Sequence, residues 1–175
     1  MKFQLHSFGE SGHSYKIALA LHFAKVDWQQ IFIDFFRGEA RSETYKNEIN
    51  AMAEVPVLVH GDKKISQSGA ILDYLHGKIG IYFGKNEQER SEILRWVLWD
   101  NSRLSGSLGP TRFLMNFIPK DKKPLEVISY LQKRNSTALS ILESHLSMHN
   151  WIAADQFSAA DLSCCSYLFY PEDFG

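Results

Sequence analysis

Residues 55–75 carry the clearest structural signal in the chain: Val55-Pro-Val-Leu-Val-His60, then Gly61-Asp62, then Lys63-Lys-Ile-Ser66, then Gln67-Ser-Gly-Ala-Ile-Leu-Asp-Tyr-Leu75. A Gly-Asp pair between two runs of β-favouring residues is a strong local signal for a hairpin. Ser68 is a good helix N-cap, and the apolar residues after it share one helical face: Ile71, Leu72, Leu75 and Ile79. This segment therefore predicts two antiparallel strands followed by a helix.

The residues before this hairpin predict a strand, a buried helix and a second strand. Residues 2–7 are typical of a short strand, and residues 12–25 are rich in helix formers with apolar residues on most faces. Residues 26–35 alternate apolar and polar side chains, as a strand does, while residues 38–50 favour a loop or a weakly held helix. A βαβ unit followed by ββα is the thioredoxin-like arrangement, which we expect over residues 1–79.

Glycines at residues 80–86 predict a linker, and residues 87–175 predict helices only. Helical spacing of apolar residues runs over residues 87–117, where we expect a bend or break at Gly106, Gly109 and Pro110. A second long amphipathic helix follows, with Leu125, Ile128, Gln132, Asn135, Leu139, Leu142 and Leu146 three or four residues apart.

A capping box marks the start of the last predicted helix. Ser158 and Asp161 have the Ser-x-x-acid spacing in which each side chain bonds the other residue's backbone, and a buried helix over residues 162–169 should follow. The predicted fold class is therefore α+β, with a thioredoxin-like N-terminal domain followed by an all-helical C-terminal domain.

The composition excludes several classes of protein. The 175 residues are 45% hydrophobic and 22% charged, and the formal net charge is −1. This balance is ordinary for a globular protein and provides no basic surface for nucleic acid. No apolar stretch approaches the roughly 20 residues that span a bilayer, and the first residues lack a signal-peptide pattern, so we expect a cytoplasmic protein with no membrane partner.

The cysteines and histidines give little support for a metal or a disulfide. Cys164 and Cys165 are adjacent, which disfavours a bridge between them and does not give the Cys-x-x-Cys spacing. His145 and His149 have the spacing of a metal pair but lack the surrounding motif, so we expect a solvated helix end and no metal.

Four motifs in this order resemble the cytosolic glutathione transferase superfamily: Ser11-Gly-His-Ser-Tyr-Lys16, Glu54-Val-Pro-Val-Leu58, Gln67-Ser-Gly-Ala-Ile-Leu-Asp-Tyr-Leu75 and Phe157-Ser-Ala-Ala-Asp-Leu162. Within it the chain is similar to the bacterial and theta-like serine types. The resemblance implies an enzyme that conjugates glutathione, its co-substrate, to small hydrophobic electrophiles, with peroxide reduction as a close variant. It also implies a homodimer with a two-fold interface.

The serine-type resemblance implies that Ser11, just before the first helix, is catalytic and donates to the glutathione sulfur. A thiol has a pKa of about 8.5, and a hydroxyl with a helix N-terminus could supply the roughly 1.4 kcal/mol that each unit of depression requires. Spacing alone does not exclude Ser7, Ser14 or Tyr15 as the donor. Because serine stands at positions 11 and 14, where thioredoxin has two cysteines, a dithiol mechanism is excluded and a redox chaperone or thiol oxidoreductase is disfavoured.

The other site residues also follow from the resemblance. It implies that the Val55–Pro56 bond is cis and that the Val55 backbone pairs with the cysteinyl backbone of glutathione; an ordinary strand-edge proline is the alternative. Gln67 and Ser68, at a helix N-terminus, would bind the γ-glutamyl carboxylate, although Ser68 could be an N-cap only. Glu54 adjoins this segment and is counted among the glutathione-binding residues.

Some positions depart from the family pattern. Ala40 replaces the histidine that contacts the glycine carboxylate in many relatives, and Arg41 or Lys46 could substitute for it. Glu54 adds a negative charge near an anionic peptide. These two departures favour the alternative function, a non-catalytic binding or scaffold module.

The sequence says less about the residues that would contact the electrophile or the neighbouring subunit's glutathione. Asp100 resembles an acidic residue that reaches the glutathione ammonium of a neighbouring subunit, with an exposed helical aspartate as the equal alternative. Candidates for the electrophile pocket are Trp99, Arg103, Arg112 and Phe113. The sequence ends at Gly175, where relatives usually continue with further helices, so the wall that selects the electrophile is not predicted.

Overall fold

The computed structural model describes residues 2–170. The chain divides into two compact units, Met1–Tyr82 and Phe83–Gly175, and the division falls within the predicted linker. Within residues 2–170, no helix combines the length and the apolar character needed to cross a membrane.

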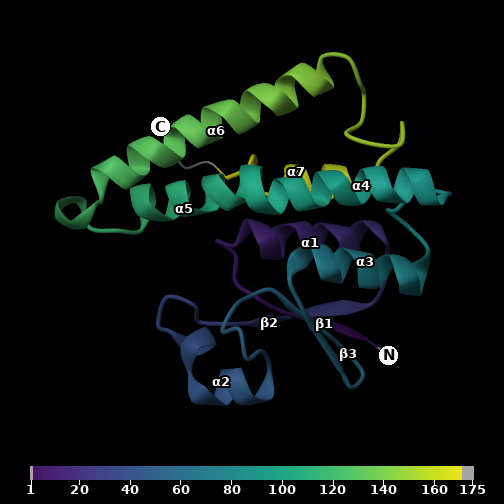
Figure 1. Cartoon of the computed structure of the whole chain (residues 1–175). Coiled ribbons are helices and arrows are strands. Elements are labelled where there is room, and N and C mark those ends of the chain that lie inside the picture. The colour runs from purple at the N-terminus through teal and green to yellow at the C-terminus, as the bar shows by residue number, and fades with distance from the viewer. Residues whose placement is uncertain (1, 171–175) are drawn as a thin grey trace. The chain divides into compact units, whose positions relative to one another are not determined.

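The first unit is a four-stranded mixed sheet with helices, and its elements are β1 (Phe3–Ser7), α1 (Gly12–Phe23), β2 (Trp28–Phe32), η1 (Glu39–Arg41), α2 (Glu43–Glu48), β3 (Val57–His60), β4 (Lys63–Ser66) and α3 (Ser68–Ile79). The strand order is β2-β1-β3-β4, with β1 parallel to β2 and the other pairs antiparallel. Helices α1 and α3 lie side by side over the sheet (Figure 1). The predicted thioredoxin-like order βαβ-ββα is confirmed.

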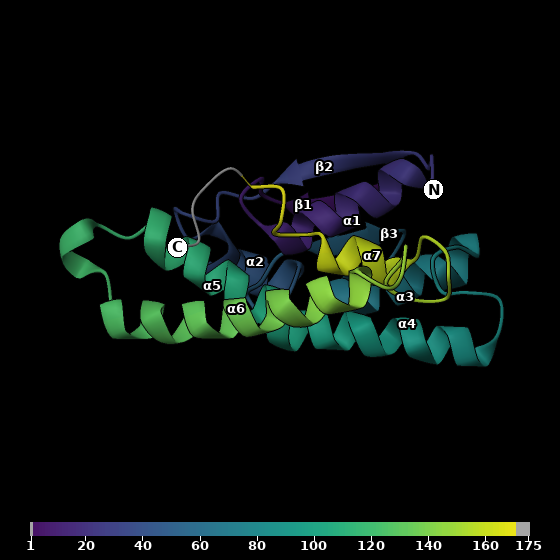
Figure 2. The same cartoon turned by 90° about the horizontal axis from the view of Figure 1, so that it is seen from above.

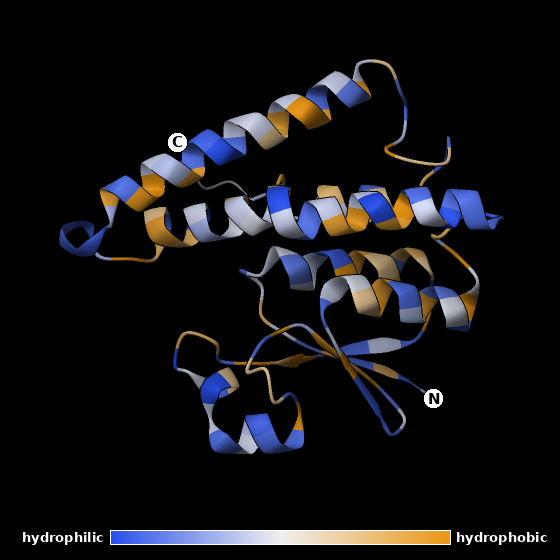
Figure 3. Ribbon diagram, in the orientation of Figure 1, coloured by the Kyte–Doolittle hydropathy of each residue, from blue (hydrophilic) through white to orange (hydrophobic). Residues whose placement is uncertain are grey.

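Burial of apolar side chains between the sheet and the two helices holds this unit together. The sheet contributes Leu5 and Leu58, and the helices contribute Ile17, Leu21, Ile71, Leu72 and Leu75, all with at most 1% of their surface exposed. Each such side chain contributes roughly 1.5–3 kcal/mol on burial. In contrast, α2 is coloured as almost entirely hydrophilic (Figure 3), which agrees with the weak helix expected there.

Two element boundaries differ from the prediction. Strand β3 begins at Val57 rather than Val55, because Pro56 has no N–H for the ladder and follows a cis bond. Helix α3 begins at Ser68 with Gln67 as its N-cap, so Ser68 is not the cap. Gln67 has a φ of 67° and its side chain does not cap the helix.

The second unit is helical, and its elements are α4 (Glu87–Trp99), η2 (Asp100–Leu104), α5 (Ser105–Asn116), η3 (Lys120–Lys122), α6 (Leu125–Leu146) and α7 (Ala159–Cys164). Two views show α6 returning along α5 and η2 (Figures 1 and 2). Orange and blue bands alternate along α6 (Figure 3), as expected of an amphipathic helix.

The long helix over residues 87–117 is interrupted earlier than predicted. The irregular turn is the π-helix η2, whereas Gly106, Gly109 and Pro110 lie inside α5. In η2 the carboxylate of Asp100 accepts the Ser105 N–H at 3.2 Å, and a side chain inserted into the helical ladder is a known cause of such irregularity. Gly109 has a packing role instead, because a Cβ there would lie 2.9 Å from the Tyr167 hydroxyl oxygen.

The predicted capping box is present at α7. The Ser158 hydroxyl accepts the Ala160 N–H at 3.2 Å, and the Asp161 carboxylate accepts the Ser158 N–H at 2.9 Å. The helix ends at Cys164, shorter than the predicted 162–169 segment.

Candidate functional site

Ser11 is the N-cap of α1 and is 7% exposed. Its hydroxyl oxygen accepts the Ser14 N–H at 3.1 Å, which satisfies one of the free donors of the first turn. Within residues 2–170 no acceptor takes the hydroxyl proton of Ser11. Ser11 is therefore both a cap and a hydroxyl donor with an unused proton.

The alternative donors differ from Ser11 in their bonding. The Ser7 hydroxyl is held inside the sheet, where it donates to the Leu5 carbonyl at 3.4 Å and accepts from Gln30 at 3.1 Å. Ser14 is 3% exposed, and its hydroxyl has no hydrogen-bond partner within the described part of the chain. Ser14 thus stays a rival to Ser11, and Ser7 does not.

The segment before β3 presents a free edge of backbone. The Val55–Pro56 bond is cis, as the family resemblance implied. Neither the N–H nor the C=O of Val55 is hydrogen-bonded by any residue in the range 2–170, since pairing of β3 with β1 and β4 begins only at Val57. Val55 is half-buried, and a half-buried amide without a partner can accept an extended peptide as an added strand.

Two side chains hold this edge in position. The Tyr45 hydroxyl and the Asn50 amide both donate to the Glu54 carbonyl, each at 3.0 Å. Burial, the largest cause, and the nearby Glu39 carboxylate raise the pKa of Tyr45 to about 12, so its hydroxyl stays protonated and donates at neutral pH. The sequence offered no signal for these two positioning contacts, because each crosses a turn whose shape depends on packing.

Two hydrogen bonds join the N-terminus of α3 to the other segments. The Gln67 amide donates to the Glu54 carboxylate at 2.8 Å, and the Ser68 hydroxyl lies 3.3 Å from His13 Nδ1 on α1. Together they bring the N-termini of α1 and α3 and the segment before β3 into one region. The N-terminus of α3 carries no side-chain cap and is therefore suited to an anion. His13 belongs to the first motif, but its contact with Ser68 was not predicted.

Three positions were considered for the glycine carboxylate of glutathione: Ala40, Arg41 and Lys46. Ala40 is 1% exposed and packs in a core cluster with Ile33, Tyr45 and Val57, so it does not present a side chain to a ligand. Lys46 forms an ion pair with Glu43 at 2.8 Å. Arg41 is exposed and its guanidinium lies 5.7 Å from the centre of the Phe35 ring.

Neither reading of Asp100 from sequence is correct. Asp100 is fully buried inside the second unit, where its carboxylate accepts hydrogen bonds from Ser105 and Ser163. A carboxylate enclosed by these donors is a structural residue of its own unit. It is neither exposed nor directed at a ligand.

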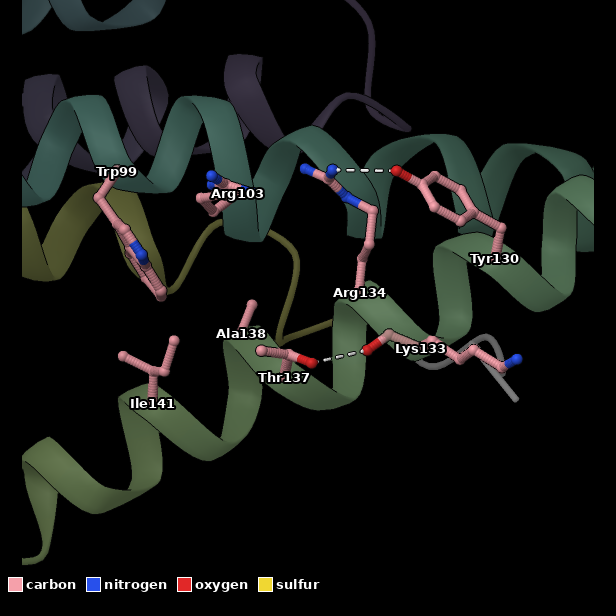
Figure 4. Close-up of a pocket in the computed structure, with 8 residues that line it drawn as sticks. All are labelled: Trp99, Arg103, Tyr130, Lys133, Arg134, Thr137, Ala138 and Ile141. Carbon is pink, nitrogen blue, oxygen red and sulfur yellow. Dashed lines mark hydrogen bonds between the residues drawn. The ribbon is translucent and has the colours of Figure 1, made fainter.

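The four residues considered for the electrophile pocket lie in different environments. Arg112 is 2% exposed, with its guanidinium 3.9 Å from the centre of the Tyr170 ring, which places it in the core of the helical unit. Phe113 is 39% exposed. Trp99 and Arg103 line a groove inside the helical unit (Figure 4).

His145 is not the solvated residue that we expected. Its ring lies 4.6 Å from Trp96 and 4.5 Å from His149, measured between ring centres, and its Nε2 lies 2.9 Å from the Ile152 carbonyl oxygen. Within residues 2–170, no group of three or more His, Cys, Asp or Glu side chains could hold a metal ion.

Comparison with known proteins identifies the family that this chain resembles. Residues 1–77 match the family model of the glutathione S-transferase N-terminal domain. Glutathione S-transferase 1 of Dianthus caryophyllus is 29% identical over 167 residues, which cover 92% of this chain and 73% of the relative. The chain is therefore similar to members of the cytosolic glutathione transferase superfamily, and its first 77 residues match the N-terminal domain of that family.

Other members of the superfamily extend the comparison. Disulfide-bond oxidoreductase YfcG of Escherichia coli is 27% identical over 163 residues, covering 90% of this chain and 75% of YfcG. The crystal structure of a possible glutathione S-transferase from Rhodopseudomonas palustris has a TM-score of 0.82 and 27% identity, over 95% of this chain and 80% of that one. The glutathione transferase superfamily fold is therefore established for both units, while the serine-type subclass stays a prediction.

Proposed function

We propose that this chain is a glutathione transferase that binds glutathione on its thioredoxin-like unit and directs the glutathione thiolate at small hydrophobic electrophiles. The observation that carries the proposal is the Ser11 hydroxyl, which accepts the Ser14 N–H and whose proton has no acceptor in the described part of the chain. Such a donor at a helix N-terminus favours a thiolate over a thiol.

The binding mode follows from the polar groups that lie near Ser11 in the thioredoxin-like unit. The cysteinyl backbone of glutathione would pair with the Val55 N–H and C=O, beside the cis Val55–Pro56 bond. Its γ-glutamyl carboxylate would lie at the N-terminus of α3, with Gln67 and Ser68 as donors. Glu54 would act through the Gln67 amide, whose position its carboxylate fixes at 2.8 Å.

The reaction is then a displacement or addition by sulfur. The thiolate, stabilised by the Ser11 hydroxyl, forms a carbon–sulfur bond. In a displacement the leaving group departs with the electron pair of the broken bond, and in an addition the π electron pair of the attacked double bond moves onto the electrophile, which takes a proton from solvent. No group on the protein changes oxidation state. The protein contributes by fixing the position of the thiolate and by lowering its pKa.

A direct test measures binding and thiolate formation separately. Calorimetric titration with glutathione gives the affinity, and ultraviolet absorbance of the complex against pH gives the pKa of the bound thiol. We expect Ser11→Ala to bind glutathione within about threefold of wild type but to raise that pKa by one unit or more, because one charge-assisted hydrogen bond contributes about 1.5–3 kcal/mol.

Two further variants identify the donor. Ser7→Ala is the matched control, because the Ser7 hydroxyl is held within the sheet, and its thiol pKa should equal that of wild type. If Ser14→Ala raises the thiol pKa and Ser11→Ala does not, Ser14 is the donor and our assignment is wrong. If wild type binds glutathione without forming thiolate or turning over electrophiles, the chain is a non-catalytic binding module.

One relative favours a second candidate reaction. YfcG is a disulfide-bond oxidoreductase. Because the thiol in this site would come from glutathione, the same thiolate could attack a disulfide, forming a mixed disulfide and releasing the other sulfur as a thiolate. This reaction needs no cysteine at positions 11 and 14. Assays with a model disulfide, a hydroperoxide and an aryl halide, each with glutathione, would rank the three reactions by kcat/KM.

A further inference from the structure

His13 is a titratable side chain to which the proposed glutathione chemistry gives no role. It lies in the first turn of α1, two residues after Ser11, and it is half-buried. Its Nδ1 lies 3.3 Å from the hydroxyl oxygen of Ser68, the first residue of α3. The two residues are 55 positions apart in the sequence, so the contact exists only because α1 and α3 lie side by side (Figure 1).

The contact between His13 and Ser68 can form in two ways, because a serine hydroxyl has one proton and two lone pairs. If Nδ1 of His13 carries a hydrogen, it donates to the Ser68 oxygen, and the Ser68 proton can be directed at a ligand. If Nδ1 carries no hydrogen, the Ser68 hydroxyl donates to it and presents lone pairs to the ligand. The state of His13 therefore decides whether Ser68 is a donor toward an anion.

Protonation of the His13 imidazole favours the first arrangement. An imidazolium has hydrogens on both ring nitrogens, so its Nδ1 always donates, whereas only one of the two neutral tautomers has a hydrogen there. The imidazolium also adds a positive charge beside the N-terminus of α3, which itself attracts anions. An anion at Ser68 should therefore bind the protonated form of His13 more tightly.

The charges around this contact also favour an imidazolium. The titratable side chains nearest to it along the elements packed around α1 are Glu10 in the loop before α1, Lys16 on α1, His6 on β1, Asp73 on α3 and Glu54 before β3. The other charged residues of α1 and α3 lie two or more helical turns further along. Carboxylates outnumber ammonium groups in this set, and nearby negative charge stabilises a protonated histidine.

Glu54 bears most directly on the ligand. Its carboxylate accepts the amide of Gln67, the residue before Ser68, at 2.8 Å. Among residues 2–170, no lysine or arginine forms an ion pair with Glu54. A positive charge on His13 would therefore offset the negative charge that Glu54 places beside an anionic peptide.

We propose that His13 is a positioning residue for glutathione, which acts through Ser68 and takes up a proton when the γ-glutamyl carboxylate binds. The inference rests on the proposed function, because it takes that carboxylate as the ligand at the N-terminus of α3. Ligand binding and protonation of His13 strengthen each other by linkage. Glutathione affinity therefore falls as pH rises through the titration range of the imidazole.

The expected effect corresponds to one half-buried, charge-assisted hydrogen bond, which favours the imidazolium by about fivefold to tenfold. For an imidazole with an ordinary pKa near 6.5, this preference means uptake of about 0.4–0.5 proton on binding at pH 7. The same preference lowers the affinity by about fourfold to sixfold between about pH 6 and pH 8.

Calorimetric titration of the full chain with S-methylglutathione tests the proposal. The methyl group removes the thiol proton, so thiolate formation beside Ser11 does not contribute to the proton count. Titrations at pH 7 in two buffers with different ionisation enthalpies give the number of protons taken up, and titrations at pH 6 and pH 8 give the change in affinity. We expect the uptake and the loss of affinity stated above for wild type.

Two substitutions of His13 separate its donor from its titration. His13→Asn places an amide near the position of Nδ1 but does not titrate, so proton uptake should vanish while the affinity at pH 8 stays within about twofold of wild type. His13→Leu has no donor, so it should also lose proton uptake and should bind about threefold or more weakly than His13→Asn at each pH.

Two controls accompany these variants. His22→Asn, at an exposed position in the last turn of α1, should take up as many protons as wild type. An S-methylglutathione analogue whose γ-glutamyl carboxylate is converted to an amide should bind wild type more weakly and without proton uptake, because it lacks the negative charge that favours the imidazolium.

Three results would overturn the proposal: proton uptake in wild type no larger than in His13→Asn, equal affinities of His13→Asn and His13→Leu with intact circular dichroism, or unchanged proton uptake with the amidated analogue. Absence of S-methylglutathione binding to wild type would overturn the proposed function itself. Binding without proton uptake would leave that function in place and remove only the role of His13.

Discussion

Replacement of Asp100 by alanine should destabilise the helical unit strongly. Asp100 is fully buried, and its carboxylate accepts the Ser105 hydroxyl at 2.6 Å, the Ser105 N–H at 3.2 Å and the Ser163 hydroxyl at 2.5 Å. Ser105 Oγ also contacts Ser166 Oγ at 2.9 Å, so it retains a partner in the variant. The main loss therefore comes from the Ser105 N–H and the Ser163 hydroxyl.

The magnitude follows from these two bonds. Hydrogen bonds to a charged group contribute about 1.5–3 kcal/mol each, and removal of the buried carboxylate recovers part of its desolvation cost, so we expect Asp100→Ala to lower the free energy of unfolding by about 2–4 kcal/mol. Asp100→Asn keeps one acceptor oxygen and should lower the free energy of unfolding by about 1–2 kcal/mol.

Urea unfolding followed by tryptophan fluorescence and far-ultraviolet circular dichroism measures these differences. Asp121→Ala is the control, because Asp121 is exposed in η3 and its loss should change stability by less than about 0.5 kcal/mol. The reasoning is refuted if Asp100→Ala matches Asp121→Ala, or if Asp100→Asn is as unstable as Asp100→Ala.

Two further predictions concern the capping box and pH. Asp161→Ala removes the acceptor of the Ser158 N–H and of the Ile152 N–H and should lower the free energy of unfolding by about 1–2 kcal/mol, measured by urea unfolding; a loss no larger than that of exposed Asp121→Ala contradicts it. Burial, the largest cause, lowers the pKa of His6. Protonation therefore favours the unfolded state, so the stabilising contribution is complete above about pH 6.5 and is lost as pH falls through the lowered folded-state pKa. Urea midpoints between about pH 7.5 and 5 should fall less in His6→Gln than in wild type, and equal slopes would show that His6 does not contribute.

Local signals in the sequence predicted the elements that depend on neighbouring residues. The Gly61-Asp62 hairpin and the Ser158–Asp161 capping box are both present, because each is made by groups within a few residues of one another. The prediction that Ser68 is the N-cap of α3 was wrong for a related reason. Ser68 has the chemistry of a cap, but its hydroxyl lies beside His13 on another helix.

Long-range contacts account for what the sequence did not predict. Asp100 was expected at the surface or toward a ligand, but one of its partners, Ser163, is 63 residues away. Ala40 was compared with a ligand-binding histidine, yet it packs in a core cluster. In both cases the residue type permits several environments, and only the packing of distant segments selects one.

For the candidate site, the sequence by itself determined the residue types and their order: a serine before the first helix, a proline before the third strand and a polar pair before the third helix. Only the tertiary structure decided that, among residues 2–170, nothing accepts the Ser11 proton or pairs with the Val55 backbone, and that Gln67 bonds Glu54. It also decided that His13 lies beside Ser68. Hydrogen-bond capacity is a property of each residue, whereas its satisfaction depends on which chain segments the hydrophobic core brings together.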